Sequence, residues 1–169
     1  MKQLSLFFFF LYAGGMLQVQ AQQAPPKLPA QLIQYFMGTW EGKGTFANGK
    51  PIASTVNCRM SLDSTWLQYE HSDVPPNQYK ALSMWGVEKN GDFIAYIFDN
   101  FGGHRQFTGS LSQDKLVLTN SQMYQGSKFY QHFVYEKLND HAFKMAYETS
   151  QDSIKWRMGD TLIYHRIMP

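Results

Sequence analysis

Cysteine is nearly absent from this chain of 169 residues, which contains only Cys58. A single cysteine cannot form an internal disulfide, so the stability of the fold must come from burial of apolar side chains. Aromatic residues make up 16% of the sequence and can supply that core. We therefore expect one domain stabilised by packing rather than by covalent cross-links.

An excess of charge of one sign is also missing. Fifteen Lys and Arg residues stand against thirteen Asp and Glu residues, for a net charge of +2, and no run of like charges occurs. Such a balance supplies neither a nucleic-acid surface nor a polybasic membrane patch. We expect no nucleic-acid partner.

Long apolar runs are confined to the N-terminus. Lys2 precedes an apolar segment, residues 4–17, and Val19-Gln20-Ala21 has the small-x-small pattern of a cleavage site. This pattern favours a secretory signal peptide over an uncleaved anchor, and no later run approaches the ~20 apolar residues of a membrane span. We expect a signal peptide at 1–21, a flexible leader at 22–28, a single domain at 29–169, and export to the periplasm or the extracellular space.

Motifs for catalysis and metal binding are missing as well. No Gly-x-Ser-x-Gly motif and no glycine-rich phosphate loop occurs. The histidines lack the spacing of a metal site; they are His71, His104, His132, His141 and His165. Cys58 alternates with Val56 and Met60, which predicts a buried thiol without a neighbouring base. We therefore predict no catalytic residues and no metal site.

What the chain does contain is a change of hydrophobic period. Leu32, Ile33, Phe36 and Met37 form one apolar stripe, which predicts a short helix over residues 29–37 that caps one end of a barrel. Beyond it the period is two. The expected strands are 39–46, 52–60, 65–72, 79–88, 93–99, 104–110, 115–120, 128–137, 142–149 and 154–167, the last of them open to a break at Gly159-Asp160.

About ten strands without intervening helices predict an all-β fold, an antiparallel meander closed into a lipocalin-like barrel. Closure removes the two exposed sheet edges. An open sandwich is the alternative.

Short motifs carry a resemblance to known families. They are Phe36-x-Gly38-Thr39-Trp40-x-Gly42-x-Gly44, Tyr96-Ile97-Phe98-Asp99-Asn100-x-Gly102, Met145-x-Tyr147-Glu148 and Tyr164-x-Arg166. The set resembles a family of small secreted bacterial lipocalin-like (calycin) proteins of unknown function. The first motif also resembles the opening of nitrobindins, ten-stranded barrels that hold haem. The chain departs from nitrobindins at Phe46, where they carry glycine, and in the segment 160–162, which lacks their histidine.

Strand alternation also predicts a ligand site. Trp40, Val56, Cys58 and Met60 fall on one face, and Trp85 and Tyr147 share it in neighbouring strands. The intervening Thr55, Asn57 and Arg59 should then face solvent. An interior rich in aromatic and methionine side chains suits an apolar ligand.

Two other candidate positions have competing interpretations. Trp40, between glycines, either fills the closed end of the barrel or contacts the ligand. Asp99, before Asn100 and Gly102, either forms a tight turn or presents a carboxylate that acts on a ligand at the barrel mouth.

Three functions follow from these observations. The first is an exported monomer or weak dimer that binds a small apolar molecule without catalysis and without a cofactor. The second, implied by the nitrobindin resemblance, is a haem-binding enzyme acting on reactive nitrogen species. The third is a structural or interaction module whose barrel is filled by its own side chains.

Overall fold

The computed structural model describes residue 24 and residues 26–168. The expected signal peptide, residues 1–21, lies outside the described residues. One helix precedes ten strands along the chain. Their bounds are α1 Ala30–Phe36, β1 Gly38–Phe46, β2 Pro51–Ser61, β3 Trp66–Asp73, β4 Lys80–Val87, β5 Phe93–Asp99, β6 His104–Leu111, β7 Lys115–Tyr124, β8 Ser127–Asn139, β9 Ala142–Ser150 and β10 Arg157–Arg166.

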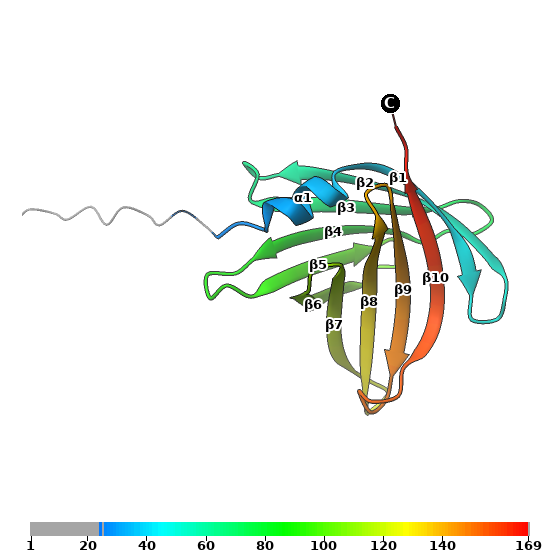
Figure 1. Cartoon of the computed structure of the whole chain (residues 1–169). Helices are drawn as coiled ribbons and strands as arrows, with labels where there is room; N and C mark the ends of the chain where they lie inside the picture. Colours follow the sequence, from blue (N-terminus) through cyan, green and yellow to red (C-terminus); the bar gives the residue numbers. More distant parts are fainter. Residues whose placement is uncertain (1–23, 25, 169) are drawn as a thin grey trace, which may run out of the picture.

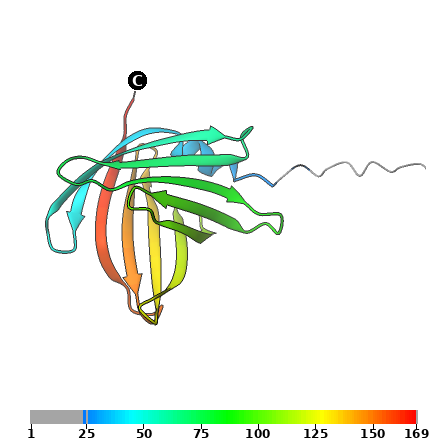
Figure 2. The same cartoon turned by 180° about the vertical axis from the view of Figure 1, so that it is seen from behind.

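The ten strands form one closed antiparallel barrel. Each strand pairs with its neighbours in the sequence, and β1 closes the ring by pairing with β10 from Trp40↔Arg166 to Phe46↔Asp160. Figures 1 and 2 show the ring from opposite sides, with α1 at one end. The predicted all-β barrel with a short N-terminal helix is confirmed, and the open sandwich is wrong. No helix in the described part of the chain is long and apolar enough to cross a membrane.

Close approach of β1 and β10 explains one glycine of the opening motif. A Cβ atom on Gly44 would lie 1.7 Å from the carbonyl oxygen of Thr161, so any larger residue would force the two strands apart. Gly44 therefore allows the pairing that closes the barrel.

The last strand differs from its expected bounds. It begins at Arg157 rather than at residue 154, because Asp152 organises the preceding segment as a loop. The Asp152 carboxylate accepts hydrogen bonds from the backbone N–H groups of Ile154 at 2.9 Å and Lys155 at 2.8 Å. Such local bonds compete with strand pairing. The expected irregularity near Gly159-Asp160 is present as a register shift between Met158 and Asp160 rather than as a break into two strands.

The helix closes its end of the barrel over Trp40. The indole is fully buried, and its N–H donates to the Phe36 carbonyl at 2.9 Å. The Arg166 guanidinium, from the last strand, stacks 4.1 Å from the Trp40 ring centroid and donates to the carbonyls of Tyr35 and Met37. Trp40 therefore fills the closed end of the barrel, as one of its two interpretations predicts, and it contacts both the helix and the terminal strand.

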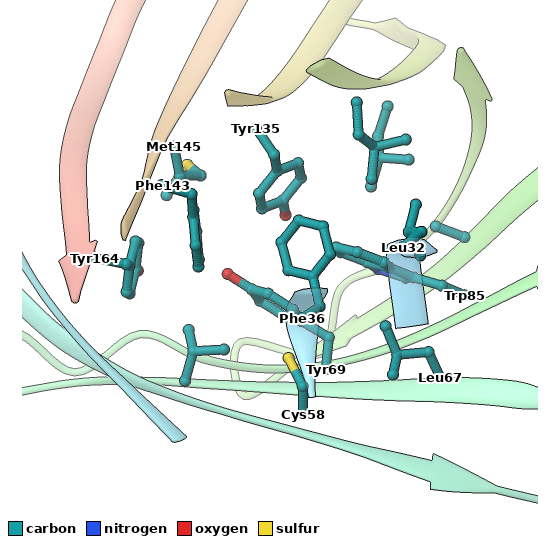
Figure 3. Packing of buried hydrophobic residues seen from close by; sticks show 14 of the residues in the cluster. Leu32, Phe36, Cys58, Leu67, Tyr69, Trp85, Tyr135, Phe143, Met145 and Tyr164 are labelled. Atoms are coloured by element: carbon teal, nitrogen blue, oxygen red, sulfur yellow. The ribbon is translucent and has the colours of Figure 1, made fainter. Parts of the chain in front are cut away.

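Aromatic side chains fill the barrel beneath the helix. Figure 3 shows the Phe36 ring standing among Trp85, Tyr135 and Phe143, with centroid distances of 5.1, 5.9 and 5.3 Å. Tyr69 stacks on Trp85 at 4.9 Å. This half of the barrel interior is therefore packed core.

The alternation predicted for β2 is also confirmed. Val56 and Cys58 are buried, whereas Thr55, Asn57 and Arg59 are exposed. The apolar face of β2 thus points into the barrel.

Candidate functional site

The interior opens into a cavity of about 480 Å³ at the end of the barrel opposite α1. Because the strands alternate in direction, β1, β3 and β5 end there, and β2, β4 and β6 begin there. The lining residues come from most strands and from the loops after β3 and β5; they are Phe46, Ile52, Tyr69, His71, Asp73, Asn77, Gln78, Tyr79, Ala81, Ser83, Ile97, Asp99, Phe101, Arg105, Phe133, Tyr135, Met145, Tyr147, Asp160 and Leu162. We call this space the barrel cavity.

The inner wall of the barrel cavity is apolar and aromatic. Tyr69, Tyr135, Met145 and Leu162 line it and also belong to the core beneath the helix. The Tyr69 side chain is almost fully buried, yet its hydroxyl forms no hydrogen bond of normal geometry with the described residues. Burial raises the pKa of both tyrosines well above the ordinary value, so each stays a neutral phenol. The inner wall therefore offers apolar surface and one unpartnered hydroxyl.

Charged side chains gather at the mouth. Asp99, the last residue of β5, accepts hydrogen bonds through Oδ1 from the backbone N–H groups of Phe101 at 3.1 Å and Gly103 at 2.9 Å. Its Oδ2 atom accepts a bond from the Arg105 guanidinium at 3.0 Å. Asp99 therefore forms the predicted turn and also lines the cavity mouth, and action of its carboxylate on a ligand stays a prediction.

The Arg105 guanidinium lies at the mouth and donates hydrogen bonds to three side chains. Its Nη1 atom donates to Gln131 Oε1 at 2.9 Å, and its Nη2 atom donates to the Tyr79 hydroxyl at 3.2 Å as well as to Asp99. The Nε atom is buried, and no atom of residues 24 and 26–168 accepts its hydrogen bond. Burial raises the pKa of Tyr79, and the Arg105 charge lowers it in part. The positive charge of Arg105 is thus balanced by the Asp99 carboxylate.

A second group of hydrogen-bonded polar side chains includes His71 and Asp73 of β3. His71 Nε2 lies 2.8 Å from Asp73 Oδ1, and both side chains are largely buried. The other ring nitrogen of His71 lies 3.4 Å from the Tyr164 hydroxyl, which in turn lies 2.6 Å from Ser54 Oγ. Burial raises the pKa of Tyr164. Both nitrogens of His71 are therefore engaged within the barrel.

Asp160 is the charged group of the mouth that lacks a partner among the residues that the structure describes. It alternates with Leu162 and Tyr164 on the inner face of β10, and its Oδ1 atom is buried without a hydrogen bond. Burial raises the pKa of Asp160 to about 6; the nearby Asp73 also raises it, whereas His71 lowers it. A carboxyl group in this state is poorly solvated and open to a new donor.

Of the six predicted ligand-binding residues, Tyr147 lines the barrel cavity and the others do not. Four of the others, Trp40, Val56, Cys58 and Trp85, are buried in the core near the helix, and Met60 packs against that core. Burial raises the pKa of the Cys58 thiol, which keeps it protonated. The structure does not bring these five side chains to the cavity, and ligand contact by them stays a prediction.

Asp99 was a candidate at the mouth, and the other mouth residues were missed although their alternation is visible in the sequence. Asp160 stands two residues before Leu162, Asp73 and His71 follow Tyr69 at steps of two, and Asp99 stands two after Ile97. Extending the inward face of each strand to its end would have found them.

Haem, the cofactor implied by the nitrobindin resemblance, does not fit the lining of the barrel cavity. Among the histidines of the described residues, only His71 lines it, and its two nitrogens contact Asp73 and Tyr164. His165 is exposed on the outer face of β10. The described residues also hold no group of three or more His, Cys, Asp and Glu side chains that could hold a metal ion.

Comparison with known proteins shows that other proteins share this barrel fold, and it does not indicate a function. No protein-family model matches the sequence, and no curated protein does. The crystal structure of Rv2717c from M. tuberculosis is similar, with a TM-score of 0.53 and 13% identity over 85% of this chain and 100% of that one. A Nostoc punctiforme protein of unknown function from the DUF3598 family gives a TM-score of 0.52 and 12% identity over 88% of this chain and 53% of that one. At such low identities the likeness shows a shared barrel fold alone.

Proposed function

We propose that the protein binds a small, mostly apolar molecule in the barrel cavity and does not change it chemically. The observation that carries this proposal is the cavity itself, whose volume of about 480 Å³ falls within the 300–1,000 Å³ typical of small-molecule sites. Its apolar inner wall and its few polar groups at the mouth also match the usual composition of such sites.

The energetics favour an apolar body with a polar end. Each buried methylene contributes roughly 0.8 kcal/mol, so a chain of about ten carbons would gain roughly 8 kcal/mol before ordering costs. Phe133, Met145 and Leu162 would contact the body, and the mouth would orient the polar end. Where the contacts of the polar end offset the ordering costs, we expect an affinity in the micromolar range, about −8 kcal/mol.

The chemistry of the lining supports binding rather than catalysis. Asp99 with Arg105, and His71 with Asp73, are paired with each other. The Cys58 thiol is buried outside the barrel cavity, and burial raises its pKa. A nucleophile needs both access to the substrate and activation by a base, and Cys58 has neither.

A fluorescence titration tests the proposal. An apolar probe whose emission rises in apolar surroundings should bind the wild-type protein in the micromolar range. Ala81, which lines the barrel cavity from β4, is replaced by Trp to fill it, and the neighbouring Leu82, which is exposed on the outer face, is replaced by Trp as a matched control. Probe binding should be lost in Ala81→Trp and kept in Leu82→Trp.

Equal binding by both variants would place the probe elsewhere and contradict the proposal. Absence of binding in the wild type would favour the filled structural module.

We further propose, from the N-terminal apolar segment and its cleavage pattern, that the protein is exported. A mature N-terminus near Gln22 in protein purified from its own cells tests this.

A further inference from the structure

We infer that the polar end of the ligand is a protonated amine, and that the Asp160 carboxylate holds it. This inference rests on the proposed binding function and names the chemical class of the ligand. It follows from the charges that line the mouth and from the one carboxylate among them that has no partner.

The charged groups at the mouth leave one carboxylate without a partner. The ionisable acids and bases that line the barrel cavity are Asp73, Asp99, Asp160, His71 and Arg105. Arg105 balances Asp99 at 3.0 Å, and His71 bonds Asp73 at 2.8 Å. Asp160 forms no ion pair among the described residues, and its Oδ1 atom accepts no hydrogen bond. A cation entering the cavity would pair with the Asp160 carboxylate.

The neighbours of Asp160 do not supply that cation. On the adjacent strands its register partners are Tyr147 on β9 and Phe46 on β1, neither of which carries a positive charge. The charged groups that act on it across the barrel are His71 and Asp73, of which only His71 could become positive, and it is already bonded to Asp73. Asp160 is therefore left for a group that comes with the ligand.

The rings around the mouth favour an ammonium group further. Tyr79, Phe101 and Tyr147 line the cavity, and Tyr79 stacks on Phe101 at 6.2 Å. The faces of aromatic rings attract cations, most strongly where water is excluded. A carboxylate ligand would instead meet the carboxylates of Asp73 and Asp160. The charge of Arg105, the one arginine at the mouth, is already paired with Asp99, so its unpartnered Nε–H is the one charged donor left for an anion. The mouth thus discriminates against anions.

Proton binding at Asp160 should make the amine preference depend on pH. Burial raises the pKa of Asp160 to about 6, so the carboxyl is mostly ionised at pH 8 and mostly protonated at pH 5. An alkylamine stays protonated at both values, as a lysine does. The amine preference should therefore be strong at pH 8 and weaken at pH 5, whereas binding of a neutral ligand of the same shape should change little.

Three probes of equal chain length test the inference: decylamine, decan-1-ol and decanoate, each competing with the apolar fluorescent probe. In the wild type at pH 8, decylamine should bind at least tenfold more tightly than decan-1-ol, and decanoate should bind least. In Asp160→Asn the amine and the alcohol should bind within about twofold of each other. Glu41→Gln, an exposed carboxylate on the outside of β1, serves as the matched control and should keep the wild-type preference.

The outcomes separate the two proposals. If amine and alcohol bind the wild type equally, or if the amine preference survives in Asp160→Asn, the inference is wrong and the proposed function stands. If none of the three compounds displaces the probe and none binds directly by calorimetry, both are wrong. A thermal melt of Asp160→Asn at or above that of the wild type at pH 8 establishes that the variant is folded.

Discussion

The unpartnered carboxylate of Asp160 should cost the protein stability at neutral and alkaline pH. Burial raises its pKa from 3.8 to about 6, so the folded protein binds this proton more tightly than the unfolded chain does. The ionised form therefore destabilises the fold, and this cost grows as the pH rises from about 4 through about 6. Two pKa units correspond to roughly 3 kcal/mol, and screening by solvent at the mouth reduces this to roughly 2 kcal/mol.

Asp160→Asn removes the charge and preserves the shape of the side chain. At pH 8 the variant should be more stable than the wild type by about 2 kcal/mol, which corresponds to a melting temperature higher by roughly 4–8 °C. Near pH 3.5, where the wild-type carboxyl is mostly protonated in both states, the two proteins should be about equally stable.

Urea unfolding followed by tryptophan fluorescence from pH 3.5 to 8 measures the difference. The same experiment on Glu41→Gln, whose carboxylate is exposed, should give a much smaller difference across that range. A difference between Asp160→Asn and the wild type that does not change with pH, or a variant less stable at pH 8, would refute the assignment of Asp160 as an uncompensated charge.

Three further predictions concern the core and the closure of the barrel. Trp40→Ala should destabilise the protein by about 3–5 kcal/mol, because a fully buried indole is lost, and a thermal melt that shifts by less than a couple of degrees contradicts this. A thiol reagent should label buried Cys58 slowly in the native protein and quickly in denaturant, and fast native labelling would show an accessible thiol. Gly44→Ala should lower the melting temperature strongly, because its Cβ would collide with the Thr161 carbonyl; a wild-type melt would mean that β1 and β10 are further apart.

The fold was predictable because its signals are local. The step of two along each strand and the turn residues between strands reveal ten strands, and the stripe of Leu32 and Phe36 reveals the helix. The start of the last strand was misplaced because β-branched Ile154 favours a strand, whereas the Asp152 side chain fixes a loop there.

The site was less predictable because its position depends on which end of the barrel the helix fills. Trp85 and Tyr147 both face inward, but Trp85 packs against Phe36 in the core while Tyr147 lines the cavity. Alternation assigns a side chain to the interior, and only the packing of the helix decides how deep the open space extends. The pairing of Arg105 with Asp99, and the absence of a partner for Asp160, likewise arise from strands that meet only in the closed barrel.

Binding of a small molecule inside the barrel can be observed in a crystal structure of the protein grown with decylamine. We expect density for the alkyl chain between Phe133, Met145 and Leu162, with the amine within hydrogen-bond distance of Asp160. Density for decylamine only on the outer surface, or a barrel cavity filled by the protein's own side chains at saturating decylamine, would contradict it.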